Sequence, residues 1–141
     1  MTNKMVDRIN RSFESQTMMK KLGARIHNIE KGSVSIEAPI LPSTLQQQGY
    51  GHAGLTFSIG DSAAGYSALT LLPEDQEVMT AEIKINLLAP AEGELLIAEG
   101  KVVKSGKRLV VVTSKINALN NGQTKLIAII QGTMVTVRMK S

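Results

Sequence analysis

The chain has 141 residues, 43% hydrophobic and 20% charged, with a formal net charge of +4. These values are typical of one globular domain spanning residues 1–141 and exclude a disordered chain. No cysteine is present, which excludes disulfides and thiolate metal sites, and we expect no metal. Two Tyr, two Phe and no Trp offer few stacking platforms for nucleic acid. With no apolar leader or membrane-length run, we expect a cytoplasmic protein without nucleic-acid or membrane partners.

The first elements are predicted from the spacing of apolar residues. Met5, Ile9 and Phe13 recur at helical intervals, which predicts an N-terminal helix within residues 1–20. Residues 24–30 and 33–40 then alternate between apolar and polar side chains, which indicates two strands. The intervening Lys31-Gly32 suits a tight turn, so these strands are expected to form a hairpin.

Residues 52–72 form the stretch that is predicted to organise the fold. This segment is apolar nearly all round, which indicates a buried helix, and Pro73 follows as a stop signal. Asp61 is the one acidic residue in it. A carboxylate on a buried helix is costly unless it is paired or used in chemistry.

Four long runs rich in Val, Ile and Thr follow Pro73, over residues 79–88, 93–104, 108–119 and 125–138. Short turns separate them, and the last turn contains Asn121-Gly122, a pair that favours a type I′ hairpin. We therefore predict a four-strand antiparallel meander. The predicted class is α+β, in the order α-β-β-α-β-β-β-β, with a curved antiparallel sheet wrapped around the central helix.

The stretch from Gly49 to Gly54 matches the G-x-G-x-x-G pattern and opens the central helix. A dinucleotide site would also need a hydrophobic strand before it and a parallel βαβ unit after it. Neither is predicted here, so we disfavour a dinucleotide site. Free N–H groups at a helix start nevertheless favour negative charge, and a developing oxyanion is one candidate for that position.

The titratable residues leave structural and functional readings open. His27 lies in an alternating strand and is expected to be an ordinary sheet residue, whereas His52 either caps the helix or takes part in chemistry. Asp61 is either a buried acid satisfied by hydroxyls such as those of Ser62 or Thr80, or a catalytic carboxylate.

Helix geometry sharpens this choice. Nine residues at ~1.5 Å each place Asp61 about 13 Å along the axis from His52. An oxyanion site at the helix start and Asp61 of the same chain therefore cannot act on one carbonyl. If both are functional, the site lies between two antiparallel copies of this helix, and the protein is a homodimer.

Three segments together resemble a known family. They are His52-Ala53-Gly54, Asp61-Ser62-Ala63-Ala64-Gly65 and residues 80–90, with further similarity through Gly93–Gly100, Val102–Arg108 and Gly132-Thr133-Met134. The pattern, over about residues 22–137, resembles the hotdog-fold acyl-CoA thioesterases of the phenylacetate-degradation type, which are related to the 4-hydroxybenzoyl-CoA thioesterases. The resemblance implies hydrolysis of an acyl-CoA thioester in a site shared between subunits. It also implies a homodimer that pairs into a homotetramer, with no cofactor other than the coenzyme A of the substrate.

The resemblance also implies roles for individual residues. Asp61 would be the catalytic nucleophile or the general base, and the Ala53 N–H would polarise the thioester carbonyl. Gln46 would orient the carbonyl or the attacking water, and Thr80 would lie near that water. His52 would hold the loop and contact the carbonyl.

Substrate contacts are expected from a second set of residues. Small Gly54 allows close backbone approach. The acyl pocket is expected to include Phe57 and Met79, and the polyanionic nucleotide end of coenzyme A is expected along basic surface. The candidates for that surface lie in one turn: Lys104, Lys107 and Arg108.

One position departs from the family pattern. The family commonly has His-Gly-Gly where this chain has His52-Ala53-Gly54. Ala53 keeps the N–H group but adds a methyl group and disfavours positive φ, so activity falls if the glycine geometry is required.

Two other functions fit the same fold. One is a protein that binds acyl-CoA without turnover, with Asp61 structural. The other is a hydratase or dehydratase, a chemistry that usually needs an Asp/His pair at the carbon chain. The acyl group and the choice between dimer and tetramer are not determined by the sequence.

Overall fold

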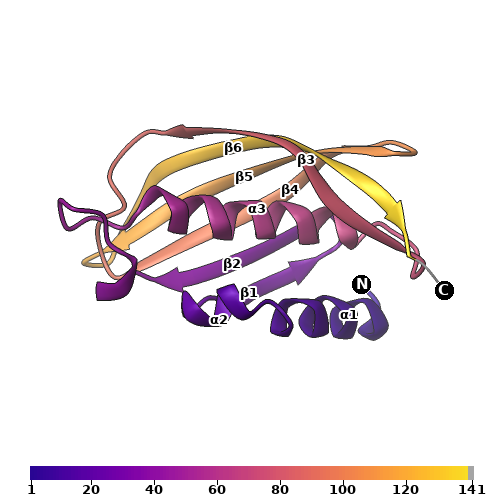
Figure 1. Cartoon of the computed structure of the whole chain (residues 1–141), viewed down its shortest axis with the longest axis horizontal. Coiled ribbons are helices and arrows are strands. Elements are labelled where there is room, and N and C mark those ends of the chain that lie inside the picture. The colour runs from indigo at the N-terminus through magenta and orange to yellow at the C-terminus, as the bar shows by residue number, and fades with distance from the viewer. Residues whose placement is uncertain (140–141) are drawn as a thin grey trace.

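The computed structural model describes residues 1–139 (Figure 1). Its helices and strands are, in chain order, α1 (Asn3–Glu14), α2 (Thr17–Lys21), β1 (Arg25–Glu30), β2 (Ser33–Pro39), α3 (Ala53–Leu69), β3 (Gln76–Leu87), β4 (Leu95–Ser105), β5 (Leu109–Asn120) and β6 (Gln123–Arg138). A 3₁₀ turn, η1 (Pro42–Thr44), lies in the loop before α3. None of the helices in this described part is long and apolar enough to cross a membrane.

The strands form one antiparallel sheet in the order β1-β2-β4-β5-β6-β3, which curves around α3 (Figure 1). The predicted fold class, a long helix wrapped by a curved antiparallel sheet, is confirmed. The turn between β5 and β6 has φ of 51° at Asn121 and 78° at Gly122. Positive φ at both central residues is the signature of the predicted type I′ turn.

The predicted four-strand meander is wrong at its first connection. β3 pairs with β6, and β4 pairs with β2 and β5, so β3 and β4 are not neighbours. The chain between β3 and β4 passes the start of α3, where the Gly51 N–H donates to the Ala91 carbonyl over 2.8 Å. A short connection between antiparallel strands does not require them to be adjacent, and here it crosses the end of the sheet.

Two predicted helices differ in length from the observed ones. The helix expected within residues 1–20 is divided into α1 and α2, because Gln16 has an extended backbone with ψ of 96°. The central helix expected over 52–72 ends at Leu69, where the Thr70 hydroxyl donates to the Ser67 carbonyl and accepts the Gly32 N–H. The predicted strand at 79–88 begins earlier, at Gln76; the other strand ends agree within two residues.

The core lies between α3 and the concave face of the sheet. Ile36, Ile59 and Ile116 are fully buried there. Gly100 of β4 faces α3 so closely that a Cβ atom would lie 2.3 Å from the Ala63 carbonyl oxygen. Because Gly100 has no side chain, α3 can lie directly against the sheet. This contact also fixes the position of the opposite face of α3.

α1 packs at the C-terminal half of α3. Ile9 and Phe13 of α1 are buried, and the Phe13 and Tyr66 rings lie 6.2 Å apart between centroids. The apolar face of α1 that the spacing of Ile9 and Phe13 predicts therefore covers one end of the central helix.

Candidate active site

The start of α3 presents a free backbone donor. His52 is the N-cap, and its Nδ1 accepts the Gly54 N–H over 2.7 Å. Accepting at Nδ1 leaves the proton of a neutral imidazole on Nε2. The Ala53 N–H has no acceptor within residues 1–139 and lies at the positive end of the helix dipole. His52 thus has the capping role considered from the sequence, and the helix start can bind a negative oxygen.

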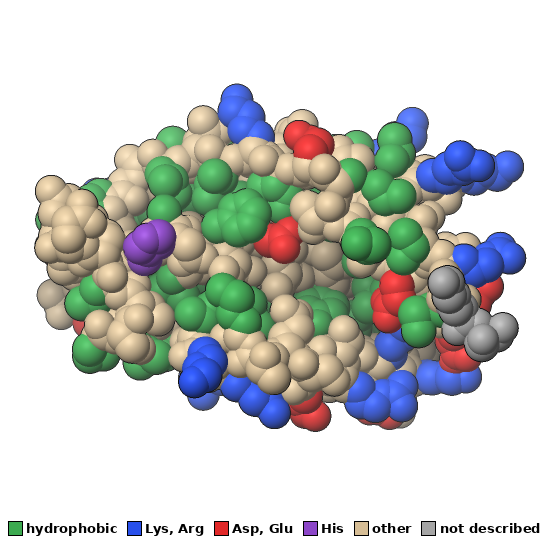
Figure 2. Space-filling model, in the orientation of Figure 1, with side chains coloured by type: hydrophobic (Ala, Val, Ile, Leu, Met, Phe, Trp, Pro, Cys, Tyr) green, Lys and Arg blue, Asp and Glu red, His purple; other side chains and the backbone are tan. Residues whose placement is uncertain are grey.

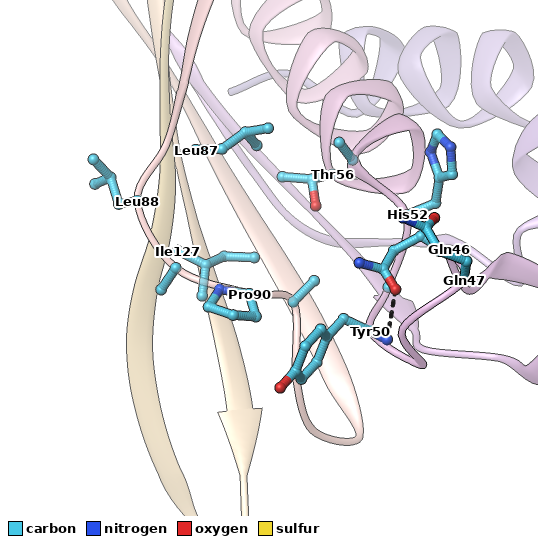
Figure 3. Close-up of a pocket in the computed structure, with 13 residues that line it drawn as sticks. Gln46, Gln47, Tyr50, His52, Thr56, Leu87, Leu88, Pro90 and Ile127 are labelled. Carbon is cyan, nitrogen blue, oxygen red and sulfur yellow. Dashed lines mark hydrogen bonds between the residues drawn. The ribbon is translucent and has the colours of Figure 1, made fainter.

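Gln46 organises the loop before the helix. Its Oε1 accepts the backbone N–H group of Gln48 over 2.5 Å. The same oxygen accepts the backbone N–H group of Tyr50 over 3.2 Å, the bond dashed in Figure 3. Gly49, with φ of +87°, allows the loop to curl around this oxygen. The carboxamide oxygen is therefore engaged. The Gln46 NH₂ group donates one proton to the Gln48 Oε1 over 3.4 Å and keeps its second proton for a ligand.

A cavity of about 510 Å³ opens beside the helix start (Figure 3). The loop and α3 provide one wall, including Gln46, Tyr50 and His52, and the opposite wall is apolar. The apolar wall comes from the end of β3, the connection after it and β6: Leu87, Leu88, Ala89, Pro90, Ala91 and Ile127. We call this space the helix-start cavity.

Asp61 lies about two turns along α3 from Ala53, half-buried and hydrogen-bonded to β3. Its Oδ1 accepts the Thr80 hydroxyl over 2.7 Å, so the structure brings these two predicted residues together. Burial raises the pKa of the Asp61 carboxyl above its usual range, and the hydrogen bond from Thr80 opposes that rise. A carboxyl held in this way is suited to act as a base or nucleophile.

A second cavity, of about 360 Å³, opens at Asp61. It lies between α3, α1, β3 and β6, and we call it the Asp61 cavity. Its lining residues are Ser12, Gln16, Asp61, Ser62, Gly65, Tyr66, Leu69, Glu77, Val78, Thr80 and Met134. It shares no lining residue with the helix-start cavity, so within one chain the oxyanion donor and the carboxylate face different spaces.

The face that carries α3 exposes hydrophobic side chains in the single chain. Figure 2 shows hydrophobic side chains gathered in its middle around an acidic group, with Lys and Arg side chains mostly at its rim. Phe57 projects from α3 one turn before Asp61 and is 39% exposed. Gly54 is half-buried, and its N–H is taken by His52.

Two expectations about substrate contacts are not met within one chain. Met79 does not line the Asp61 cavity: it is 62% exposed, because Val78 and Thr80 point inward and strand alternation turns Met79 to the opposite face. Lys104 at the end of β4 and Lys107 and Arg108 on the following turn are exposed and line neither cavity. His27 lies on β1 with Nδ1 3.4 Å from a Glu37 carboxylate oxygen, as a sheet residue.

Several cavity residues were missed from the sequence. Tyr50 had a detectable signal, since it is an aromatic residue within the glycine-rich loop. Tyr66 also had one, as a polar-tipped ring on an apolar helix one turn beyond Asp61. Ser12 and Gln16 had no signal, because only packing brings α1 to this cavity. No cluster of His, Asp or Glu able to hold a metal occurs within residues 1–139.

Comparison with known proteins identifies the family. The sequence model of the thioesterase superfamily matches residues 48–125. A thioesterase family protein from Silicibacter pomeroyi is 36% identical in its crystal structure, with a TM-score of 0.93 over 95% of this chain and 98% of that one. The chain belongs to the thioesterase superfamily. It has the hotdog-type thioesterase fold.

Other relatives of this thioesterase-superfamily chain differ more in sequence. A Saccharolobus solfataricus protein named "Putative esterase" is 32% identical over 94% of the chain and 86% of its own length. The 1,4-dihydroxy-2-naphthoyl-CoA hydrolase of Listeria monocytogenes is 27% identical over 70% of the chain and 80% of its own length. The E. coli PaaI protein from the phenylacetic acid degradation operon shares the fold, with a TM-score of 0.82 at 22% identity over 98% of this chain and 95% of that one.

Proposed function

We propose that the protein hydrolyses acyl-CoA thioesters in a site formed by two antiparallel copies of the chain. One copy supplies the Ala53 N–H and the Gln46 loop, and the other supplies Asp61 and Thr80. The observation that carries this proposal is the placement of a free donor and a half-buried carboxylate about 12 Å apart on one helix, each opening to its own cavity. An antiparallel partner helix would bring the two halves together.

The free edge of the sheet supports a dimer. Within residues 1–139, β3 pairs with β6 and with no other strand, so its other edge has no strand partner. Such an edge is a template for pairing with a second chain. Pairing of two β3 strands across a two-fold axis would place the two copies of α3 side by side and cover the apolar face around Phe57. A dimer of dimers is the assembly we propose.

The reaction follows from the groups in each half. The Ala53 N–H would donate to the thioester carbonyl oxygen as negative charge develops on it. Asp61 would either remove a proton from water, so that hydroxide adds to the carbonyl carbon, or add to that carbon itself to give an anhydride that water then cleaves. In both routes the carbon–sulfur bond breaks, and coenzyme A leaves as the thiol after protonation of its sulfur.

The coenzyme A arm would occupy the helix-start cavity. Its apolar wall suits the pantetheine chain, and the second N–H of Gln46, beside the one given to Gln48, would donate to a carbonyl of the substrate. We propose that Lys104, Lys107 and Arg108 contact the nucleotide phosphates from the partner copy, since they line no cavity of their own chain. His52 would act by holding the Ala53 N–H in place through its cap to Gly54.

The test is thiol release from a panel of short, long and aromatic acyl-CoAs, with the wild type beside Asp61→Asn. We expect turnover by the wild type and a fall in kcat of about 10²–10⁴-fold in the variant, the usual contribution of a catalytic base. The matched control is Asp7→Asn, which removes an exposed acid from α1 and should leave turnover unchanged. Acyl-CoA binding without turnover in the wild type would instead support a binding protein.

A further inference from the structure

Tyr66 places a hydroxyl group at the far end of the Asp61 cavity. The residue is 6% exposed, and its hydroxyl accepts the Gln16 Nε2–H over 2.7 Å and lies 3.0 Å from the Ser12 Oγ. All three residues line the cavity. A polar group at the end of a cavity between apolar side chains such as Leu69 and Met134 fixes which ligand atoms can be accommodated there.

These three residues have hydrogen-bonding capacity to spare. A tyrosine hydroxyl has one proton to donate and two lone pairs, and Gln16 occupies one lone pair. If Ser12 donates to Tyr66, the tyrosine proton is free for a ligand; if Tyr66 donates to Ser12, the serine proton is free. In either arrangement the cluster of Ser12, Gln16 and Tyr66 can donate one hydrogen bond into the cavity.

The position of α1, which supplies Ser12, is fixed. Arg8 of α1 donates to the Pro73 carbonyl over 3.1 Å and also to the Gln76 carbonyl. Its guanidinium lies 3.5 Å from a Glu77 carboxylate oxygen. These bonds hold α1 against the connection between α3 and β3, so the end of the cavity has a defined shape.

The cavity has the size of an acyl group and extends from the Asp61 carboxylate toward the C-terminal end of α3. Its volume of about 360 Å³ is too small for the whole of coenzyme A. The coenzyme A part of the bound substrate would therefore extend into the partner's helix-start cavity. Tyr66 follows Asp61 by five residues, about 7 Å along the helix axis. The acyl group would therefore point from the reacting carbonyl at Asp61 toward Tyr66.

We propose that Ser12, Gln16 and Tyr66 form a selectivity subsite for a hydrogen-bonding substituent at the far end of a compact acyl group. This inference rests on the proposed thioesterase function. A site with a buried donor discriminates against an acyl group that leaves the donor unpaired, so an acyl-CoA ending in a hydroxyl should be preferred over its methyl-ended counterpart.

The test compares kcat/KM for acyl-CoAs that differ only by a terminal hydroxyl, using butanoyl-CoA and hexanoyl-CoA with 4-hydroxybutanoyl-CoA and 6-hydroxyhexanoyl-CoA. We expect a preference of about tenfold or more for the hydroxylated member of at least one pair. In Tyr66→Phe this ratio should fall by about tenfold. The control is Tyr50→Phe, which changes the chain's other tyrosine, in the other cavity, and should leave the ratio unchanged.

The outcomes separate this inference from the function on which it rests. Hydrolysis of both members of each pair with no preference, or with a preference that survives Tyr66→Phe, would overturn the subsite and leave the thioesterase intact. Absence of hydrolysis on these four substrates would overturn the subsite, and absence of hydrolysis on the wider panel of short, long and aromatic acyl-CoAs as well would overturn both. If Tyr66→Phe does not fold, Ser12→Ala carries the test, because it removes one half-buried hydroxyl and should lower the same ratio.

Discussion

At the scale of single residues, Asp61 is subject to two opposed effects. Burial raises the pKa of its carboxyl, and the hydrogen bond from Thr80 lowers it. Thr80→Val removes only the second effect, so the pKa rises further and the ionised, reactive form appears at higher pH. We expect the acid limb of the kcat/KM profile to move to higher pH in Thr80→Val, measured from about pH 4 to pH 8. Thr80→Ser keeps the donor and should follow the wild type; an unchanged limb in Thr80→Val would contradict a role for Thr80.

The same raised pKa predicts how stability depends on pH. The folded chain binds the Asp61 proton more tightly than the unfolded chain does, so this contribution is fully present below the unfolded pKa and is lost as pH rises through the folded value. Asp61→Asn cannot ionise, and we expect its melting temperature to exceed that of the wild type at neutral pH. The difference should shrink in acid. Thermal scans at both pH values test this, and a destabilised variant at neutral pH would contradict it.

Ala53 allows its backbone donor to be removed almost alone. Proline lacks an N–H but is well tolerated at the first position of a helix, and the preceding His52 has the extended backbone, with ψ of 142°, that proline requires. We expect Ala53→Pro to lower kcat by about 10²–10³-fold, the usual cost of losing one oxyanion donor. Ala53→Gly keeps the donor and should retain turnover. Full activity in a folded Ala53→Pro protein would exclude this N–H from catalysis.

At the scale of elements, the contact between α3 and β4 depends on Gly100. A methyl group there would lie 2.3 Å from the Ala63 carbonyl oxygen, which is backbone and cannot move alone. We expect Gly100→Ala to lower the free energy of unfolding by about 1–3 kcal/mol, measured by urea denaturation. Gly65→Ala is the matched control on the helix, because the nearest atoms lie 3.9 Å away. It should be neutral or stabilising by up to about 1 kcal/mol, since alanine favours helix.

The positions of the helices and strands are predicted from the sequence more accurately than the pairing of the strands. Apolar periodicity is a local property, so residues 24–40 and the runs after Pro73 were assigned to strands with small errors at their ends. Which strands pair is decided by packing around α3, and this is why β3 was placed beside β4 rather than β6. The break at Gln16 was missed for a similar reason: its backbone changes direction as α1 docks, and Gln16 then bonds to Tyr66.

At the scale of the whole molecule, a site shared by two chains predicts complementation. Asp61→Asn and Ala53→Pro would each disable both sites of their own dimer. In a mixed dimer one site has both defects and the other has neither. Random exchange should therefore restore about a quarter of wild-type turnover, measured after the two inactive variants are co-expressed or unfolded and refolded together. Mixing without unfolding is the control, and no recovery in verified mixed dimers would place the site within one chain.

The candidate site was predictable to the extent that its chemistry is local. Asp61 stands out as a charge on an apolar helix, and its distance from His52 follows from helix geometry alone. The partnership with Thr80 was among the options considered, and the structure supports it with a 2.7 Å bond. The walls of both cavities were not predictable, because they are assembled from α1, β3 and β6, which only the tertiary fold brings to α3.

In the part of the chain that the structure describes, β3 pairs with β6 alone, and this has a consequence for the order in which the chain can fold. During synthesis at about 5–20 residues per second, β3 emerges complete several seconds before the last residue of β6. In that interval neither edge of β3 has its native strand partner, whereas β4 and β5 can pair with β2 and with each other as they emerge. The strand that is covered last within the chain is also one of the two edge strands of the sheet, the other being β1. In a nascent chain, the edge of β3 that belongs to β6 is open to aggregation until β6 pairs with it. In the finished chain, the other edge stays open until a second copy of the chain covers it.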